Sequence, residues 1–137
     1  MQTLSLFPQL FDFQMLGIFM IRITIGFIFV YFWYEKVFLD RASRIDFFRK
    51  IGLLPARYYF WIISSLEGIL GILLIIGLWT QAAGITAGIL MAVATFIKWR
   101  NPAALPKNTL DFYIILSVAS FALLFLGPGA FAIDLPL

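Results

Sequence analysis

Two side chains of opposite charge lie inside apolar stretches of this 137-residue chain. Glu67 falls within a nearly unbroken apolar run over residues 62–77, and Arg22 falls within another at about 15–38. An ionised group at the centre of a bilayer costs roughly 2.5–3.5 kcal/mol on insertion scales, so such groups are usually paired or used. We therefore predict a direct or water-mediated ion pair between Arg22 and Glu67.

Three roles are open to this intramembrane pair. It could fix the register of two helices, as a buried ion pair can. It could form a polar pocket that binds a headgroup or a quinone carbonyl. Alternatively, Arg22 could snorkel to the nearer membrane surface. At 1.5 Å per residue the two groups differ in depth by about 6–8 Å, which an extended arginine side chain on a tilted helix can bridge.

The composition is that of an integral membrane protein. Hydrophobic residues make up 63% of the chain and charged residues 12%, with a mean hydropathy of +1.00; soluble domains carry about 25% charged residues. The chain contains no cysteine and no histidine, which excludes thiol–disulfide chemistry, a cysteine-bound iron–sulfur cluster and histidine-ligated haem or zinc on this chain. We predict no catalytic centre here, and no covalent or metal-ligated cofactor.

The hydropathy pattern predicts an all-α protein, a four-helix transmembrane bundle formed by residues 1–137 as a single domain. Residues 3–13 form a short interfacial lead-in, and an interfacial amphipathic helix follows the first span, with apolar residues at 45, 48 and 51 among basic ones. The predicted spans are about 15–38, 59–78, 82–98 and 110–126, and the predicted interfacial helix is about 43–52. The connector between the second and third spans is so short that we expect those spans to run antiparallel side by side.

Basic residues predict the orientation. Nine of the ten lysines and arginines flank the first and third connections, and the tenth is Arg22. The positive-inside rule then places both basic loops in the cytoplasm and both termini outside a cell (inner or plasma) membrane. The net charge of +3 therefore reports topology, and no nucleic-acid partner is expected.

Four other charged residues are secondary candidates for the site: Lys36, Lys98, Asp111 and Asp134. Simpler roles are also open to the first three. Lys36 anchors the end of the first span. Asp111 opens the fourth span, where the helix dipole favours an acid, and it could also pair with Lys98 at the end of the third span. Gly84 and Gly88 begin a stripe of small residues that lets two helices approach closely in lipid.

Taken together, these motifs resemble the DoxX family of small four-span membrane proteins. The resemblance runs almost from end to end. The first span has the family's arginine, glycine and lysine, an interfacial phenylalanine–glycine–proline segment follows it, and the second span has a glutamate–glycine stretch. The fourth span has an acidic start, and the glycine-rich tail ends in an aspartate. The matching residues are Arg22, Gly26, Lys36, Phe48, Gly52, Pro55, Glu67, Gly68, Gly71, Gly77, Thr80, Ala82, Ala83, Asn108, Asp111, Gly127, Pro128, Gly129 and Asp134.

The resemblance implies a function as well as a fold. Family members are linked to quinone-dependent sulfur oxidation, as membrane subunits of a thiosulfate:quinone oxidoreductase, and to thiol-stress complexes. This chain would then be an accessory subunit of a quinone-linked redox complex, with a quinone or a lipid as its ligand and other membrane subunits, or copies of itself, as partners in the bilayer. The alternatives are a non-catalytic structural or assembly subunit and a small transporter or lipid-binding protein.

The chain departs from the family pattern at three positions. Gln81 replaces a residue that is often basic, and Asp111 stands where glutamate is more usual. The histidine common at the end of the third span is absent, with Lys98 in that neighbourhood. The missing histidine weakens any proton-transfer role that the resemblance would imply at that position.

Overall fold

The computed structural model describes residues 6–134, which form helices joined by short connections and contain no strand. The all-α prediction is confirmed. The elements in chain order are η1 (Pro8–Phe13), α1 (Gln14–Tyr34), η2 (Glu35–Leu39), α2 (Arg41–Lys50), α3 (Ala56–Ile76), α4 (Thr80–Arg100), η3 (Pro102–Ala104) and α5 (Leu110–Leu126).

Three of these helical stretches are long and apolar enough to cross a membrane. They are Pro8–Leu39, which joins η1, α1 and η2, then α3 and α4. The fourth apolar helix, α5, has 17 residues, close to the shortest helix that spans a hydrocarbon core of about 30 Å. The arrangement is compatible with a four-helix membrane bundle.

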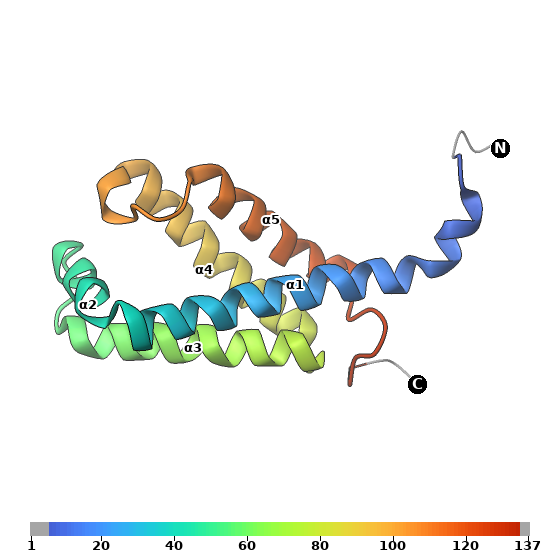
Figure 1. Cartoon of the computed structure of the whole chain (residues 1–137), viewed down its shortest axis with the longest axis horizontal. Helices are drawn as coiled ribbons and strands as arrows, with labels where there is room; N and C mark the ends of the chain where they lie inside the picture. Colours follow the sequence, from blue (N-terminus) through green and yellow to red (C-terminus); the bar gives the residue numbers. More distant parts are fainter. Residues whose placement is uncertain (1–5, 135–137) are drawn as a thin grey trace.

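The long helices associate as two tight pairs, α1 with α3 and α4 with α5 (Figure 1). Although α4 follows α3 after a short turn, the two helices diverge toward the end where α2 lies, and they share far fewer contacts than either tight pair. The expectation of side-by-side packing between the second and third spans is therefore wrong over most of their length. The turn fixes only their adjoining ends, while packing with α1 and α5 decides where the rest of each helix goes.

Glycine allows the backbones of α1 and α3 to touch. A Cβ atom built on Gly26 would lie 2.9 Å from the carbonyl oxygen of Gly71, and one built on Gly71 would lie 2.8 Å from the carbonyl oxygen of Gly26. Gly68 lies against the indole ring of Trp33 in the same helix pair. Close backbone approach at small residues is a typical source of helix association in lipid.

The α4–α5 pair uses the predicted stripe of small residues. Gly84 faces the backbone carbonyl of Ser120, and Gly88 faces the ring of Phe121. Ser117 also donates a hydrogen bond of 3.0 Å to the carbonyl oxygen of Gly88. The stripe therefore contacts α5.

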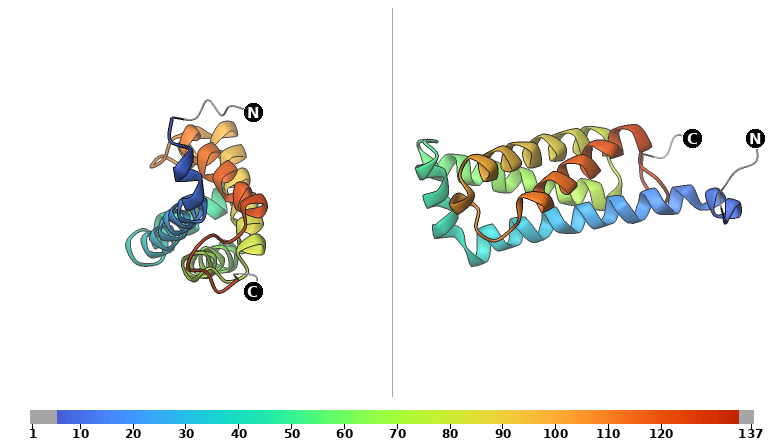
Figure 2. Two further views of the ribbon diagram at one scale, coloured as in Figure 1. Left: turned by 90° about the vertical axis from the view of Figure 1, so that its right-hand side faces the viewer. Right: turned by 90° about the horizontal axis from the view of Figure 1, so that it is seen from above.

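Helix α2 lies across one end of the bundle (Figures 1 and 2). Its buried Phe48 packs with Ala56 and Phe60 at the start of α3, so its apolar face is covered by protein. The connection that contains α2 and the loop between α4 and α5 lie at the same end, which gathers the basic residues of both connections there (Figure 1). We call this the basic end.

Candidate functional site

Glu67 forms an ion pair with Lys36. The Lys36 Nζ donates to Oε1 of Glu67 at 2.7 Å and to Oε2 at 2.8 Å. The glutamate is 3% exposed, and the lysine side chain is 17% exposed. Lys36 belongs to η2, a π-helical turn that ends α1, and single π turns are frequent at functional sites.

Arg22 takes no part in this pair, and the predicted Arg22–Glu67 contact is wrong. The fully buried guanidinium instead donates from Nη1 to the carbonyl oxygens of Leu74 at 2.8 Å and Ile75 at 3.2 Å, and from Nη2 to that of Ala130 at 2.9 Å. Carbonyl groups in the last turn of a helix have no partner within the helix and carry the negative end of its dipole. They are therefore good acceptors for a buried cation.

The register of α1 against α3 explains the difference. The backbone contact between Gly26 and Gly71 places Arg22 level with Ile75, which is eight residues beyond Glu67 and therefore about 12 Å along the helix axis. That separation exceeds the 6–8 Å expected from depth alone. Lys36 follows Arg22 by 14 residues, close to four full turns, so both cations face α3 at different depths.

Around Arg22 the C-terminal tail ties three helix ends together. The Ala130 amide donates to the carbonyl oxygen of Met15, and the Asp134 amide donates to that of Gly77. The Asp134 carboxylate accepts a hydrogen bond from the backbone N–H of Thr80, the first residue of α4. Burial alone raises the pKa of Asp134, but hydrogen bonds from the Thr80 and Trp79 amides outweigh it and hold that pKa below its usual value. The carboxylate is therefore ionised at neutral pH and caps α4.

A cavity of about 170 Å³ lies between the helices toward the basic end, with the Lys36–Glu67 pair in its wall. All five α-helices contribute residues to it. Most of the wall is apolar, as in binding sites for small organic molecules, which add a few polar groups that orient the ligand. Its apolar lining includes Phe32, Phe47, Ile63, Leu90, Met91 and Ile97, and its polar lining includes Arg44, Asn108 and Tyr113.

Two cationic side chains that line this cavity have donor capacity left. An ammonium group has three N–H donors, and Lys36 uses two of them on Glu67. The Nε of Arg44 is buried and has no hydrogen-bond partner among residues 6–134. Buried donors without partners are rare in folded proteins, so the cavity is suited to a ligand that accepts hydrogen bonds.

A second ion-pair cluster lies at the basic end and joins the loop between α4 and α5 to the end of α1. Lys107, in the loop between α4 and α5, contacts the carboxylates of Glu35 and Asp40, the latter at 3.1 Å. The hydrogen bond from Lys107 lowers the pKa of Asp40, and hydrogen bonds to Glu35 and Asp40 raise the pKa of Lys107. Lys107 and Asp40 are partly solvated, so their pair contributes little to stability, whereas Glu35 is buried and anchors the loop through Lys107.

The remaining predicted site residues have structural positions. Lys98 donates to the carbonyl oxygens of Pro102 at 3.0 Å and Leu105 at 2.7 Å, so it binds its own loop and does not pair with Asp111. Asp111 is exposed in the first turn of α5. The cap of that helix is Thr109, whose hydroxyl accepts from the Phe112 amide.

Sequence reasoning missed the cavity and two residues in its wall, Arg44 and Tyr113. It placed Lys36 only among the secondary candidates for the site. The 14-residue spacing from Arg22 to Lys36 on one face of α1 was a usable signal, because it offers Glu67 a second cation. No comparable signal marks Arg44, which reaches the cavity only because α2 folds across the bundle end.

Comparison with known proteins gives one finding. The family model described as DoxX matches residues 17–99, a segment that includes Arg22, Lys36, Arg44 and Glu67. Neither the curated proteins nor the solved structures contain a match to the chain.

Proposed function

Because this chain belongs to the DoxX family of membrane proteins, we propose that it is a non-catalytic membrane subunit that holds a lipid-soluble, carbonyl-bearing ligand of the quinone class beside Lys36 and Glu67. Electrons would come from the cofactor of a partner protein, because this chain has no cysteine or histidine with which to hold a redox centre. The subunit would thus be accessory to a quinone-linked membrane redox complex.

The observation that carries the proposal is a buried ion pair in the wall of an apolar cavity. A quinone ring is apolar on its faces and accepts hydrogen bonds at its carbonyl oxygens. The third N–H of Lys36 and the Nε of Arg44 are donors of the required kind. Charge-assisted hydrogen bonds of this sort are roughly twice as strong as neutral ones.

The open side of the cavity favours entry from the bilayer. Tyr59 on α3 and Val93 on α4 both line the cavity, and both are exposed. These are the two helices that diverge toward the basic end (Figure 1). A ligand with a long apolar tail could therefore place its head in the cavity and leave its tail in the lipid between α3 and α4.

We also propose that the basic end faces the cytoplasm, following the positive-inside rule. A cysteine introduced at Ala103, in the exposed loop at the basic end, should react with a membrane-impermeant maleimide in inverted vesicles and stay unlabelled in intact spheroplasts. The natural chain provides a clean background, because it has no cysteine. Labelling in spheroplasts would reverse the proposed orientation.

Ligand binding can be tested with decylubiquinone and the purified protein in detergent. Binding to the folded state raises stability by about 2.7 kcal/mol at a hundredfold excess over Kd, so the thermal unfolding midpoint should rise. Ala94→Phe, which places a ring in the cavity wall and keeps the ion pair, should abolish the rise. The matched control Val118→Ala, on an exposed face of α5, should keep it.

A tail-matched alcohol, decanol, separates quinone recognition from general uptake of apolar molecules. Equal stabilisation by decanol and decylubiquinone would count against the quinone class. A wild-type midpoint that does not move at saturating decylubiquinone would overturn the ligand proposal and leave the alternative, a structural or assembly subunit of a larger membrane complex. That alternative expects stable co-purification with other membrane proteins instead.

A further inference from the structure

The segment before α1 is apolar and has no partner within the described chain. None of the residues of η1 is buried, and Leu10, Phe11 and Phe13 are each about 60% exposed. Leu6 and Phe7, just before η1, are also exposed. The C-terminal tail contacts α1 at Met15, where the Ala130 amide bonds to the Met15 carbonyl.

This segment runs across the axis of the bundle. The backbone leaves the helical conformation at Phe13 (φ −99°, ψ 19°), and η1 turns away from α1 in both the side view and the end-on view (Figures 1 and 2). Since α1 crosses the membrane, η1 is directed along the membrane plane and not through it.

Its depth matches the edge of the bilayer. Arg22 is level with Ile75 in the last turn of α3, and Gln14 precedes Arg22 by eight residues, about 12 Å along the axis. Headgroups extend roughly 5–8 Å beyond the hydrocarbon core on each side of a bilayer. The segment therefore begins roughly 10 Å beyond the end of α3, at the outer boundary of the headgroup layer of the leaflet opposite the basic end.

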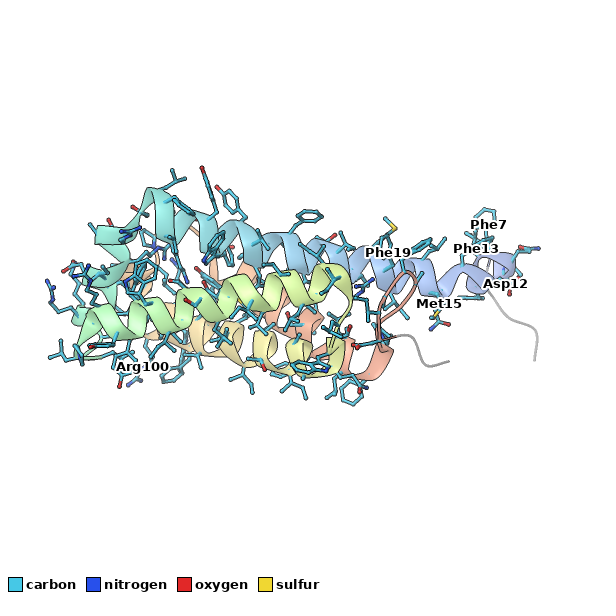
Figure 3. The ribbon with its side chains drawn as sticks, turned by 90° about the horizontal axis from the view of Figure 1, so that it is seen from below. Phe7, Asp12, Phe13, Met15, Phe19 and Arg100 are labelled. Carbon is cyan, nitrogen blue, oxygen red and sulfur yellow. The ribbon has the colours of Figure 1, made fainter. Side chains whose placement is uncertain are left out.

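The segment also has separate polar and apolar edges. A 3₁₀-helix has three residues per turn, so side chains three apart align. Gln9 and Asp12 share one edge, Leu10 and Phe13 share a second, and Phe11 lies on the third. In Figure 3 the side chains of Phe7 and Asp12 project from opposite sides of this segment.

We propose that residues 6–13 are a lipid anchor, which inserts its aromatic and leucine side chains into the leaflet opposite the basic end and leaves Gln9 and Asp12 in water. Its only charged residue is Asp12, so insertion relies on apolar burial and needs no anionic lipid. Segments that combine aromatic and leucine side chains with polar ones gather at membrane interfaces, where the apolar groups enter the lipid and the polar groups stay in water.

Single-cysteine spin labelling of the otherwise cysteine-free chain tests the anchor. Labels at Leu10, Phe11, Gln9 and Asp12 would be measured in nanodiscs of phosphatidylcholine, with oxygen as the lipid-soluble relaxation agent and a nickel chelate as the water-soluble one. Labels at Leu10 and Phe11 should relax faster with oxygen, and labels at Gln9 and Asp12 should relax faster with nickel. Adding phosphatidylglycerol should change neither pattern.

Two results would overturn the proposal. Nickel access at all four positions would place the segment in water, and shielding from both agents at all four would show that protein covers it, for example a second copy of the chain. Because the segment makes no buried contact in the described structure, these variants should unfold at the wild-type temperature. Neither result depends on quinone binding.

Discussion

Replacing Lys36 with methionine should destabilise the folded protein by about 3–5 kcal/mol, the usual cost of removing one partner of a buried ion pair. The remaining charge, Glu67, is only 3% exposed, so its carboxylate cannot reach solvent without disturbing the packing of α3. The free energy of unfolding can be measured by titrating dodecylmaltoside micelles with SDS and following helix content by circular dichroism.

The double variant Lys36→Met/Glu67→Leu is the informative control. Replacing both members of a buried pair by apolar residues is often neutral or stabilising, so the double variant should recover most of the lost stability. If it is as unstable as the sum of both single variants, the pair does not act as a unit. A stable double variant that no longer responds to decylubiquinone would assign the ion pair to binding and not to folding.

Replacing Arg22 with methionine should cost about 3 kcal/mol or more, because three carbonyl groups lose a charged donor and each such bond contributes about 1.5–3 kcal/mol. The C-terminal tail should also loosen, since Ala130 is bound by both Arg22 and Met15. Amide hydrogen exchange at Ala130 and Asp134 measures this loosening directly.

Two milder substitutions give a scale for the stability loss of Arg22→Met. Asp134→Ala removes the cap on α4 but keeps the bonds of Arg22, so it should cost about 1 kcal/mol. Arg22→Lys keeps the charge but cannot span three acceptors with one ammonium group, so it should fall between Asp134→Ala and Arg22→Met. A loss below 1 kcal/mol for Arg22→Met would show that the guanidinium does not hold the tail.

The ion pair in the structure, Lys36–Glu67, differs from the predicted one because of helix register. Depth estimates locate a charge along the membrane normal only to within one or two turns, whereas an ion pair requires a match within a few ångströms. Here the contact of Gly26 with Gly71 sets the register. It brings Arg22 to the end of α3 and leaves Glu67 within hydrogen-bonding distance of Lys36.

By itself the sequence determined that this is an all-helical membrane protein, with four apolar helices, a short helix after the first span and basic residues gathered in two connections. Those features depend on local composition and periodicity, so no tertiary contact is needed to read them. Tertiary structure alone decided that Glu67 meets Lys36, that the tail binds Arg22, and that α3 and α4 diverge around a cavity lined by Arg44. Each of these depends on how far one helix slides or tilts against another, which is set by backbone contacts between residues distant in sequence and leaves no periodic signal in the chain.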